Sequence, residues 1–234
     1  IMLFAIAPDM FVGVSSNWDD TAAALLDKEY YELPVIGHLY GGKGEVNLEE
    51  VAKLAPQLLI DMGKAKGSIV EDLDALQDQI GVTCVHIDAT LSTMPEAYRT
   101  LGQLLGREEK GEELAAYCEQ WLKTTDELLA KVGSENLVKA IYCVGEDGLS
   151  VLAKTSFHAE IIDLLTNNVA VVDDVSSKGS GNAVDMEQLL LWDPDFIIFS
   201  PDGGYENAKS DETWQQLKAI ANGNFVEVPY GPYN

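Results

Sequence analysis

The residues of this chain best suited to chemistry are aromatic, basic and glycine-rich segments that directly follow apolar runs. The runs at 35–39 and 57–61 have the composition of strands, and they precede Tyr40-Gly41-Gly42-Lys43 and the pair Lys64 and Lys66. Aromatic rings suit flat, partly apolar ligands such as macrocycles and catecholates, whereas lysines and glycine-rich turns suit anionic groups. Core or surface packing is the alternative for each aromatic residue alone, but their position after strand ends favours a ligand-binding site. We expect this site to contain Trp18, His38, Tyr40, Gly41, Gly42, Lys64, His158, Tyr205 and Tyr230.

The three histidines do not form a metal-binding motif. None of His38, His86 and His158 has a second histidine or a cysteine at the spacing of a helical or ribbon site. His86 lies in an apolar run, which predicts a hydrogen-bonded core residue. His158 opens a helix, and we expect it to contact the ligand or to be an axial ligand to a bound metal complex. We therefore predict no bare-metal site and no cofactor, although the ligand can itself contain a metal.

Motifs of catalysis are missing from the sequence. It has no GxSxG elbow and no HExxH pair, and Gly41-Gly42-Lys43-Gly44 lacks the spacing of a P-loop. The cysteines Cys84, Cys118 and Cys143 stand alone in apolar stretches, which indicates small buried residues rather than a disulfide framework. We predict that the protein has no reaction of its own.

The composition excludes two classes of partner. The 234 residues carry a net charge of -24 with a pI near 4.2, so the surface repels nucleic acid and anionic lipid. The acidic residues form either a solvated coat or a surface that meets a cationic partner. Hydrophobic residues make up 47%, which suffices for a core, and no stretch approaches the ~20 apolar residues of a membrane span.

The elements that position these residues include one segment that appears twice. The segment 47–60 returns as 185–198, and each copy reads as a short helix, a proline and an apolar strand. Asn47 and Asp185 are good N-caps, and Glu50 and Gln188 three residues later complete a capping box. One element used once in each of two similar lobes predicts a ligand cleft between the lobes.

The rest of the pattern predicts two doubly wound α/β lobes joined by one long helix. Apolar positions at helical spacing over 107–133 predict a helix roughly 37 Å long, after a helix at 94–105. The predicted domains are 1–106, the interlobe helix 107–133, and 134–234. The predicted strands are 11–15, 35–39, 57–61, 82–88, 138–144, 169–172, 195–199 and 225–228. The other predicted helices are 19–27, 47–55, 68–79, 157–166, 185–192 and 211–220.

The chain resembles the helix-linked class of ABC-transporter substrate-binding proteins, whose members carry iron–siderophore complexes, haem, cobalamin and related ligands. The resemblance rests on the doubled helix–proline–strand element and covers nearly the whole chain. Compared with the family, we expect the first strand and the terminal helices to be missing from the residues given. The segments that carry it are Leu33-Pro34-Val35-Ile36-Gly37, Gly44-Glu45-Val46-Asn47-Leu48-Glu49, Leu54-Ala55-Pro56-Gln57-Leu58-Leu59-Ile60 and Trp192-Asp193-Pro194-Asp195-Phe196-Ile197-Ile198.

The resemblance implies a monomeric protein outside the cytoplasm, periplasmic or a lipoprotein of the cell surface, that captures a metal complex or similar solute. It implies delivery to a membrane permease dimer, with Glu49 and Glu187 meeting arginines of the permease; stabilisation of the helix N-terminus is the alternative for both. A two-lobed enzyme of the glycosyltransferase or chelatase kind, and a binding module that senses rather than transports, remain alternative functions.

Overall fold

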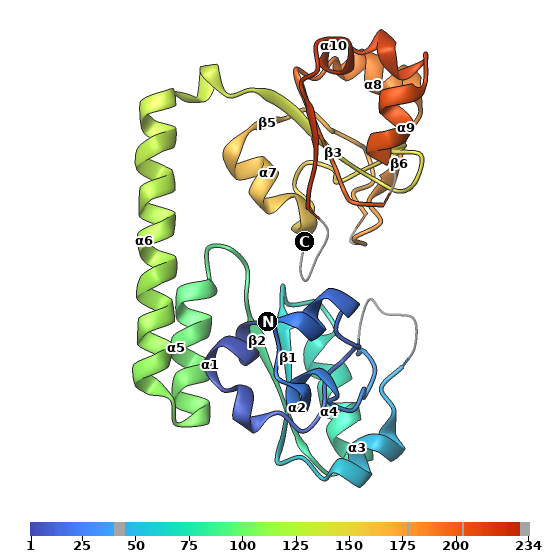
Figure 1. The fold of residues 1–234 in the computed structure, drawn as a ribbon. Helices are drawn as coiled ribbons and strands as arrows, with labels where there is room; N and C mark the ends of the chain where they lie inside the picture. Colours follow the sequence, from blue (N-terminus) through green and yellow to red (C-terminus); the bar gives the residue numbers. More distant parts are fainter. Residues whose placement is uncertain (40–44, 177, 203, 230–234) are drawn as a thin grey trace. The chain divides into compact units, whose positions relative to one another are not determined.

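Each half of the chain builds a sheet of its own in the computed structural model, which describes residues 1–39, 45–176, 178–202 and 204–229 (Figure 1). The chain separates into an N-terminal unit, Ile1–Thr125, and a C-terminal unit, Asp126–Asn234. The division falls inside helix α6 (Glu108–Val132), which is the long helix expected over 107–133. The two α/β lobes and the long helix predicted from the sequence are therefore confirmed.

The sheet of the N-terminal unit consists of β1 (Leu58–Gly63) and β2 (Thr83–Asp88). The two strands are parallel and in register from Leu58 opposite Thr83 to Gly63 opposite Asp88. The helices of this unit are α1 (Met2–Ile6), α2 (Lys28–Tyr31), α3 (Leu48–Leu54), α4 (Ile69–Ile80) and α5 (Met94–Leu105), with short 3-10 turns η1 (Pro8–Met10) and η2 (Asp20–Ala24).

The core of the N-terminal unit lies between this sheet and helices α1 and α5. Ile6, Ile87 and Leu101 are its buried residues from three elements, and Ile60 and Met62 of β1 pack against them. Alternate residues of β1 and β2 face this core because side chains alternate across a strand. The residues between them, Asp61 and His86 among them, therefore point to the opposite side of the sheet.

Helices α5 and α6 pack with their backbones close together. A Cβ atom on Gly111 would lie 2.7 Å from the Tyr98 carbonyl oxygen and 3.0 Å from the Gly102 Cα. Arg99 of α5 ties the pair together through ion pairs of 2.8 Å to Glu112 and to Glu119 of α6. The first half of α6 is therefore held firmly against the N-terminal unit.

Two predicted strands and one predicted helix of this unit are shorter than expected. The runs 11–15 and 35–39 are joined only by an isolated bridge between Val14 and Val35. Pro34 has no N–H to donate, and Gly37 turns the chain at a φ of +86°, so the ladder cannot continue. The helix predicted at 19–27 is the 3-10 turn η2, which Asp19 caps by accepting from the Thr21 amide.

The C-terminal unit contains a mixed six-stranded sheet with the path β6-β4-β3-β7-β8, and β5 also pairs with β3. Strands β3, β7 and β8 are parallel, as the sequence pattern predicted, and β5 also pairs with β3 in parallel. Strands β4 and β6 add two antiparallel pairings that the pattern did not predict. The strands are β3 (Lys139–Val144), β4 (Ser150–Val151), β5 (Asn167–Asn168), β6 (Asn182–Ala183), β7 (Phe196–Phe199) and β8 (Phe225–Glu227). The helical elements are η3 (Ser134–Asn136), η4 (Phe157–Ala159), α7 (Glu160–Leu165), α8 (Met186–Trp192), α9 (Gly204–Ser210), η5 (Trp214–Gln216) and α10 (Lys218–Ala221).

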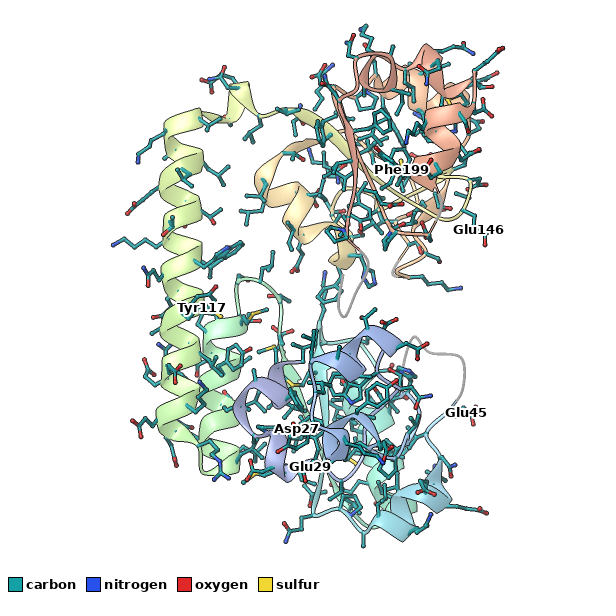
Figure 2. The ribbon with its side chains drawn as sticks, viewed as in Figure 1. Asp27, Glu29, Glu45, Tyr117, Glu146 and Phe199 are labelled. Atoms are coloured by element: carbon teal, nitrogen blue, oxygen red, sulfur yellow. The ribbon has the colours of Figure 1, made fainter. Side chains whose placement is uncertain are left out.

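The core of this unit is built around Phe199 on β7, which Figure 2 labels. Its ring contacts Trp214 edge-on at 5.5 Å, and Ile197 of the same strand and Ile141 of the adjacent strand β3 are fully buried with it. The prediction of a strand at 169–172 is wrong, because the residues that pair with β3 are Asn167 and Asn168. After them the chain turns, and Val171 is 63% exposed. The helix predicted at 211–220 is divided into η5 and α10, and α9 was not foreseen.

The repeated segment folds alike in both units. Asn47 Oδ1 accepts from the Glu50 amide at 3.0 Å, and Asp185 Oδ1 accepts from the Gln188 amide at 2.8 Å. Each helix ends one residue before a proline, at a residue in the left-handed conformation: Ala55 with φ +46° and Asp193 with φ +45°. The return bond of the predicted capping box does not form in the first copy, because the Asn47 amide donates to the Ile36 carbonyl and Glu50 pairs with Lys53. In the second copy the cap bond is that from the Gln188 amide to Asp185.

No helix among the residues described here combines the length and the apolar character needed to cross a bilayer.

Candidate functional site

The N-terminal unit presents a polar edge where its two parallel strands end. Gly63 and Asp88 are paired as the last residues of β1 and β2. The Ala89 amide donates to the Gly63 carbonyl at 3.0 Å, and the Ala65 amide donates to Asp88 Oδ1 at 3.3 Å, so the two following loops begin side by side. Lys64 is the first residue after β1 and is exposed. In α/β proteins ligands bind at such carboxyl ends.

A cluster of hydroxyl groups follows β2 at the same edge. Thr90 Oγ1 lies 3.0 Å from Thr93 Oγ1 and 3.2 Å from Ser92 Oγ, and the Thr93 hydroxyl also contacts the Asp88 carbonyl at 3.3 Å. Sequence reasoning missed these residues, although three hydroxyls directly after a predicted strand were visible in it. We call Lys64, Thr90, Ser92 and Thr93 the polar edge.

The chemistry of the polar edge suits an anionic, oxygen-rich ligand. Hydroxyl groups can donate to anionic oxygens, and Lys64 supplies positive charge. Lys64 forms no ion pair with any carboxylate in the described part of the chain. Lys64 and the three hydroxyl groups share the edge because they follow paired strand ends.

Two aromatic residues predicted to bind ligand are packed inside their own units. Trp18 stands edge-on to Phe4 at 5.3 Å, and its indole nitrogen donates to the Tyr30 carbonyl at 2.8 Å. Tyr205 of α9 lies 5.1 Å from the Phe225 ring, and Lys209 lies 5.5 Å from its ring centroid. These contacts occupy much of both side chains, as the alternative of aromatic packing anticipates.

The histidines have three different surroundings. His38 is half-buried in the N-terminal unit. His158 of the C-terminal unit is exposed, stands edge-on to Phe157 at 5.4 Å and lies beside Gly179. His86 has its Nδ1 2.7 Å from Asp61 Oδ2, and its Nε2 is buried without a partner in the described structure. The structure therefore gives His86 the hydrogen-bonded interior position that the sequence predicted.

The other predicted ligand residues, Tyr40, Gly41, Gly42 and Tyr230, lie outside the described residues. Of the described ones, Trp18, His38 and Lys64 belong to the N-terminal unit and His158 and Tyr205 to the C-terminal unit.

Thiol and metal chemistry find little support in the described part of the chain. Burial raises the pKa of the Cys143 thiol far above its ordinary value, and burial also raises the pKa values of Cys84 and Cys118. These thiols are therefore protonated and weakly nucleophilic at neutral pH. Within the described residues, no group of three or more His, Cys, Asp or Glu side chains is arranged to hold a metal ion.

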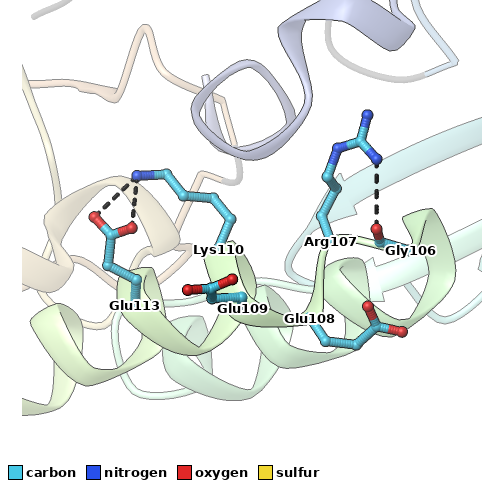
Figure 3. Close-up of a pocket in the computed structure, with 6 residues that line it drawn as sticks. All are labelled: Gly106, Arg107, Glu108, Glu109, Lys110 and Glu113. Atoms are coloured by element: carbon cyan, nitrogen blue, oxygen red, sulfur yellow. Dashed lines mark hydrogen bonds and ion pairs between the residues drawn. The ribbon is translucent and has the colours of Figure 1, made fainter.

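An open pocket of about 480 Å³ lies at the corner between α5 and α6 (Figure 3). Two of its cations are already paired: Lys110 with Glu113 at 2.9 Å, and Arg107 with Asp9 at 2.9 Å. None of the residues predicted to bind ligand lines it. Its lining residues are Gly106, Arg107, Glu108, Glu109, Lys110 and Glu113.

Glu49 and Glu187 hold equivalent positions in the repeated element. Each lies in the first turn of its helix, two residues after the cap, and each is exposed. Neither carboxylate forms an ion pair with the residues that the structure describes. Both are therefore available to a partner.

The two-lobed fold matches one class of protein. The family model described as "Periplasmic binding protein" matches residues 12–230, and the chain belongs to this family. A comparison with curated protein sequences gave no match.

Solved structures agree with this assignment. The chain is similar to an ABC transporter solute binding protein from Sulfurospirillum deleyianum, with 26% identity, a TM-score of 0.88, and coverage of 100% of this chain and 73% of that one. It is similar to a periplasmic solute binding protein from Veillonella parvula, with 25% identity, a TM-score of 0.69, and coverage of 99% and 71%. The periplasmic vitamin B12 binding protein BtuF of Vibrio cholerae, at 21% identity, a TM-score of 0.73, and coverage of 97% and 83%, shares the fold. The chain is thus a periplasmic solute-binding protein of an ABC transporter, and its family and neighbours are not enzymes.

Proposed function

We propose that this protein captures an acidic, oxygen-rich metal complex of the ferric siderophore type and delivers it to its permease. The observation that carries the proposal is the polar edge, where Lys64 and three hydroxyl groups follow two adjacent parallel strands. Catecholate, hydroxamate and carboxylate groups of such complexes present anionic oxygens that these side chains can bind.

Haem and cobalamin are the second candidates, and two contacts disfavour them. A flat macrocycle is best held by aromatic faces. Trp18 already packs against Phe4 and Tyr205 against Phe225, so neither ring is fully available within its unit. His158 is exposed and favours these candidates, because it could act as an axial ligand to the metal of either complex.

A thermal-shift screen distinguishes these solute classes. The panel consists of a ferric tris-catecholate, a ferric hydroxamate, haem, cobalamin and molybdate. We expect a ferric siderophore complex to raise the melting temperature by several degrees, since a ligand at 100 times its Kd adds ~2.7 kcal/mol to stability. Lys64→Ala should weaken that binding about tenfold, whereas Lys123→Ala, an exposed lysine of α6, should not. Stabilisation by haem or cobalamin alone would refute the siderophore assignment.

The same proposal assigns Glu49 and Glu187 to permease docking. Two exposed carboxylates on equivalent elements suit two arginines of a two-fold permease, because a guanidinium binds a carboxylate through two parallel hydrogen bonds. The protein would act as a monomer outside the cytoplasm, either free in the periplasm or lipid-anchored.

Charge reversal tests the docking role. Glu49→Lys combined with Glu187→Lys should abolish solute uptake while leaving the Kd for the solute unchanged, because both side chains point to solvent in the free protein. The matched control is Glu71→Lys with Glu206→Lys, one exposed first-turn glutamate from each unit, which should leave uptake intact. Normal uptake by the Glu49/Glu187 variant would show that docking uses another surface.

A further inference from the structure

One turn of the C-terminal unit has a backbone conformation that its residue type disfavours. Three non-glycine residues in the described chain have a left-handed φ: Ala55, Thr155 and Asp193. Ala55 and Asp193 are the helix ends of the repeated element, where the following proline stops the helix. Thr155 has a φ of +73°, ends no helix, and is β-branched, for which this conformation is an outlier.

The turn around Thr155 has the geometry that normally calls for glycine. The Ser156 amide donates to the Ala153 carbonyl at 3.0 Å, which closes a four-residue turn with Thr155 in third place. A positive φ at that place defines a type II turn, where glycine or asparagine is usual. Glycine would relieve the strain, so the threonine side chain needs an explanation other than folding.

Neighbouring residues hold the strained turn in place. The Thr155 amide donates to Asp163 Oδ2 at 2.7 Å, and Asp163 Oδ1 accepts from Asn168 Nδ2 at 2.7 Å. Asn168 is only 1% exposed and also accepts from the Ala170 amide at 3.0 Å. The Lys154 amide donates to the Ala170 carbonyl at 2.8 Å. Strain that is fixed from several sides is typical of functional sites.

The side chains around this turn suit an anion. Lys154, Thr155 and His158 are exposed, and Lys154 forms no ion pair with the described residues. Ser156 is 6% exposed, yet its hydroxyl has no hydrogen-bond partner in the described structure and does not cap the helical turn that follows. A buried polar group without a partner calls for one from outside the chain, such as a ligand or a water molecule.

We infer that the turn Ala153–Ser156 is a preformed contact of the C-terminal unit for an anionic oxygen group of the solute. Lys154 supplies the charge and the Thr155 hydroxyl donates a hydrogen bond, and the exposed His158 follows in η4. The inference rests on the proposed function and adds residues that the sequence pattern did not indicate.

Binding of a ferric tris-catecholate by four variants tests the turn. Lys154→Ala should raise the Kd at least tenfold. Thr155→Gly should raise it about threefold, because glycine keeps the left-handed backbone and removes only the side chain. Lys139→Ala removes the same charge at the amino end of β3, and Ala55→Gly makes the same backbone relief at a helix end; both should stay within twofold of the unchanged protein.

The outcomes separate this inference from the proposed function. Melting curves first establish that each variant is folded. Suppose that the unchanged protein binds the catecholate. If Lys154→Ala then binds it equally well, or loses no more affinity than Lys139→Ala does, the turn is not a contact, and the siderophore assignment stands. If the unchanged protein binds neither the catecholate nor the ferric hydroxamate, both the siderophore assignment and the inference about the turn are overturned.

Discussion

At the scale of single residues, the pair Asp61 and His86 is notable because one nitrogen of the His86 ring has a partner and the other has none among the described residues. Their side chains are 24% and 13% exposed, and they meet across β1 and β2 at 2.7 Å. His86 has only this one partner in the described structure, since its Nε2 is buried and unpaired. Truncating Asp61 would therefore remove the hydrogen-bond partner of the His86 ring.

We expect Asp61→Ala to lower the free energy of unfolding by about 1–3 kcal/mol, the usual consequence of leaving a buried polar group unsatisfied. Denaturant unfolding measures it. Asp74→Ala, on the exposed face of α4, serves as the control and should change stability by less than about 0.5 kcal/mol. Equal effects of the two substitutions would show that the Asp61–His86 contact adds nothing.

At the scale of elements, the sequence predicted the helix, the proline and the strand of the repeated segment, although the return bond of its predicted capping box does not form in the first copy. Its N-caps and its proline act on residues within a few positions, and its helical pattern places Val51 and Leu189 at buried positions with 0% exposure. The strands predicted at 11–15 and 35–39, in contrast, form only one bridge in the described structure. Apolar runs alone do not reveal that Pro34 and Gly37 restrict the pairing to one bridge. The sequence thus predicted the parallel strands of the C-terminal sheet, but not the extent of the pairing between 11–15 and 35–39.

The caps of the repeated element can be tested together. Asn47→Ala and Asp185→Ala should each lower the unfolding free energy by about 1 kcal/mol, because each removes the side-chain acceptor of a helix amide. Asp27 precedes α2 as an N-cap but makes no such hydrogen bond, so Asp27→Ala should have a smaller effect. Losses of the same size at all three positions would argue that charge or propensity, rather than capping, is responsible.

At the scale of the whole molecule, the sequence predicted two α/β lobes and a long helix, and membership of the family confirms the class of protein. Which side chains contact the solute stays a prediction. The aromatic residues Trp18 and Tyr205 follow apolar runs, and the structure shows that both rings pack against other aromatic rings of their own units. Thr90, Ser92 and Thr93 became candidates only when the parallel register placed them at the same edge as Lys64.

The close contact between α5 and α6 restricts which residues a related sequence can have at two positions. Because a methyl group at Gly111 would press on the Tyr98 carbonyl and the Gly102 backbone, the space there admits only hydrogen. A related chain that keeps this helical hairpin must therefore have glycine at the position equivalent to Gly111, even where the other residues of the two helices differ. The position equivalent to Gly102 has little room for any side chain.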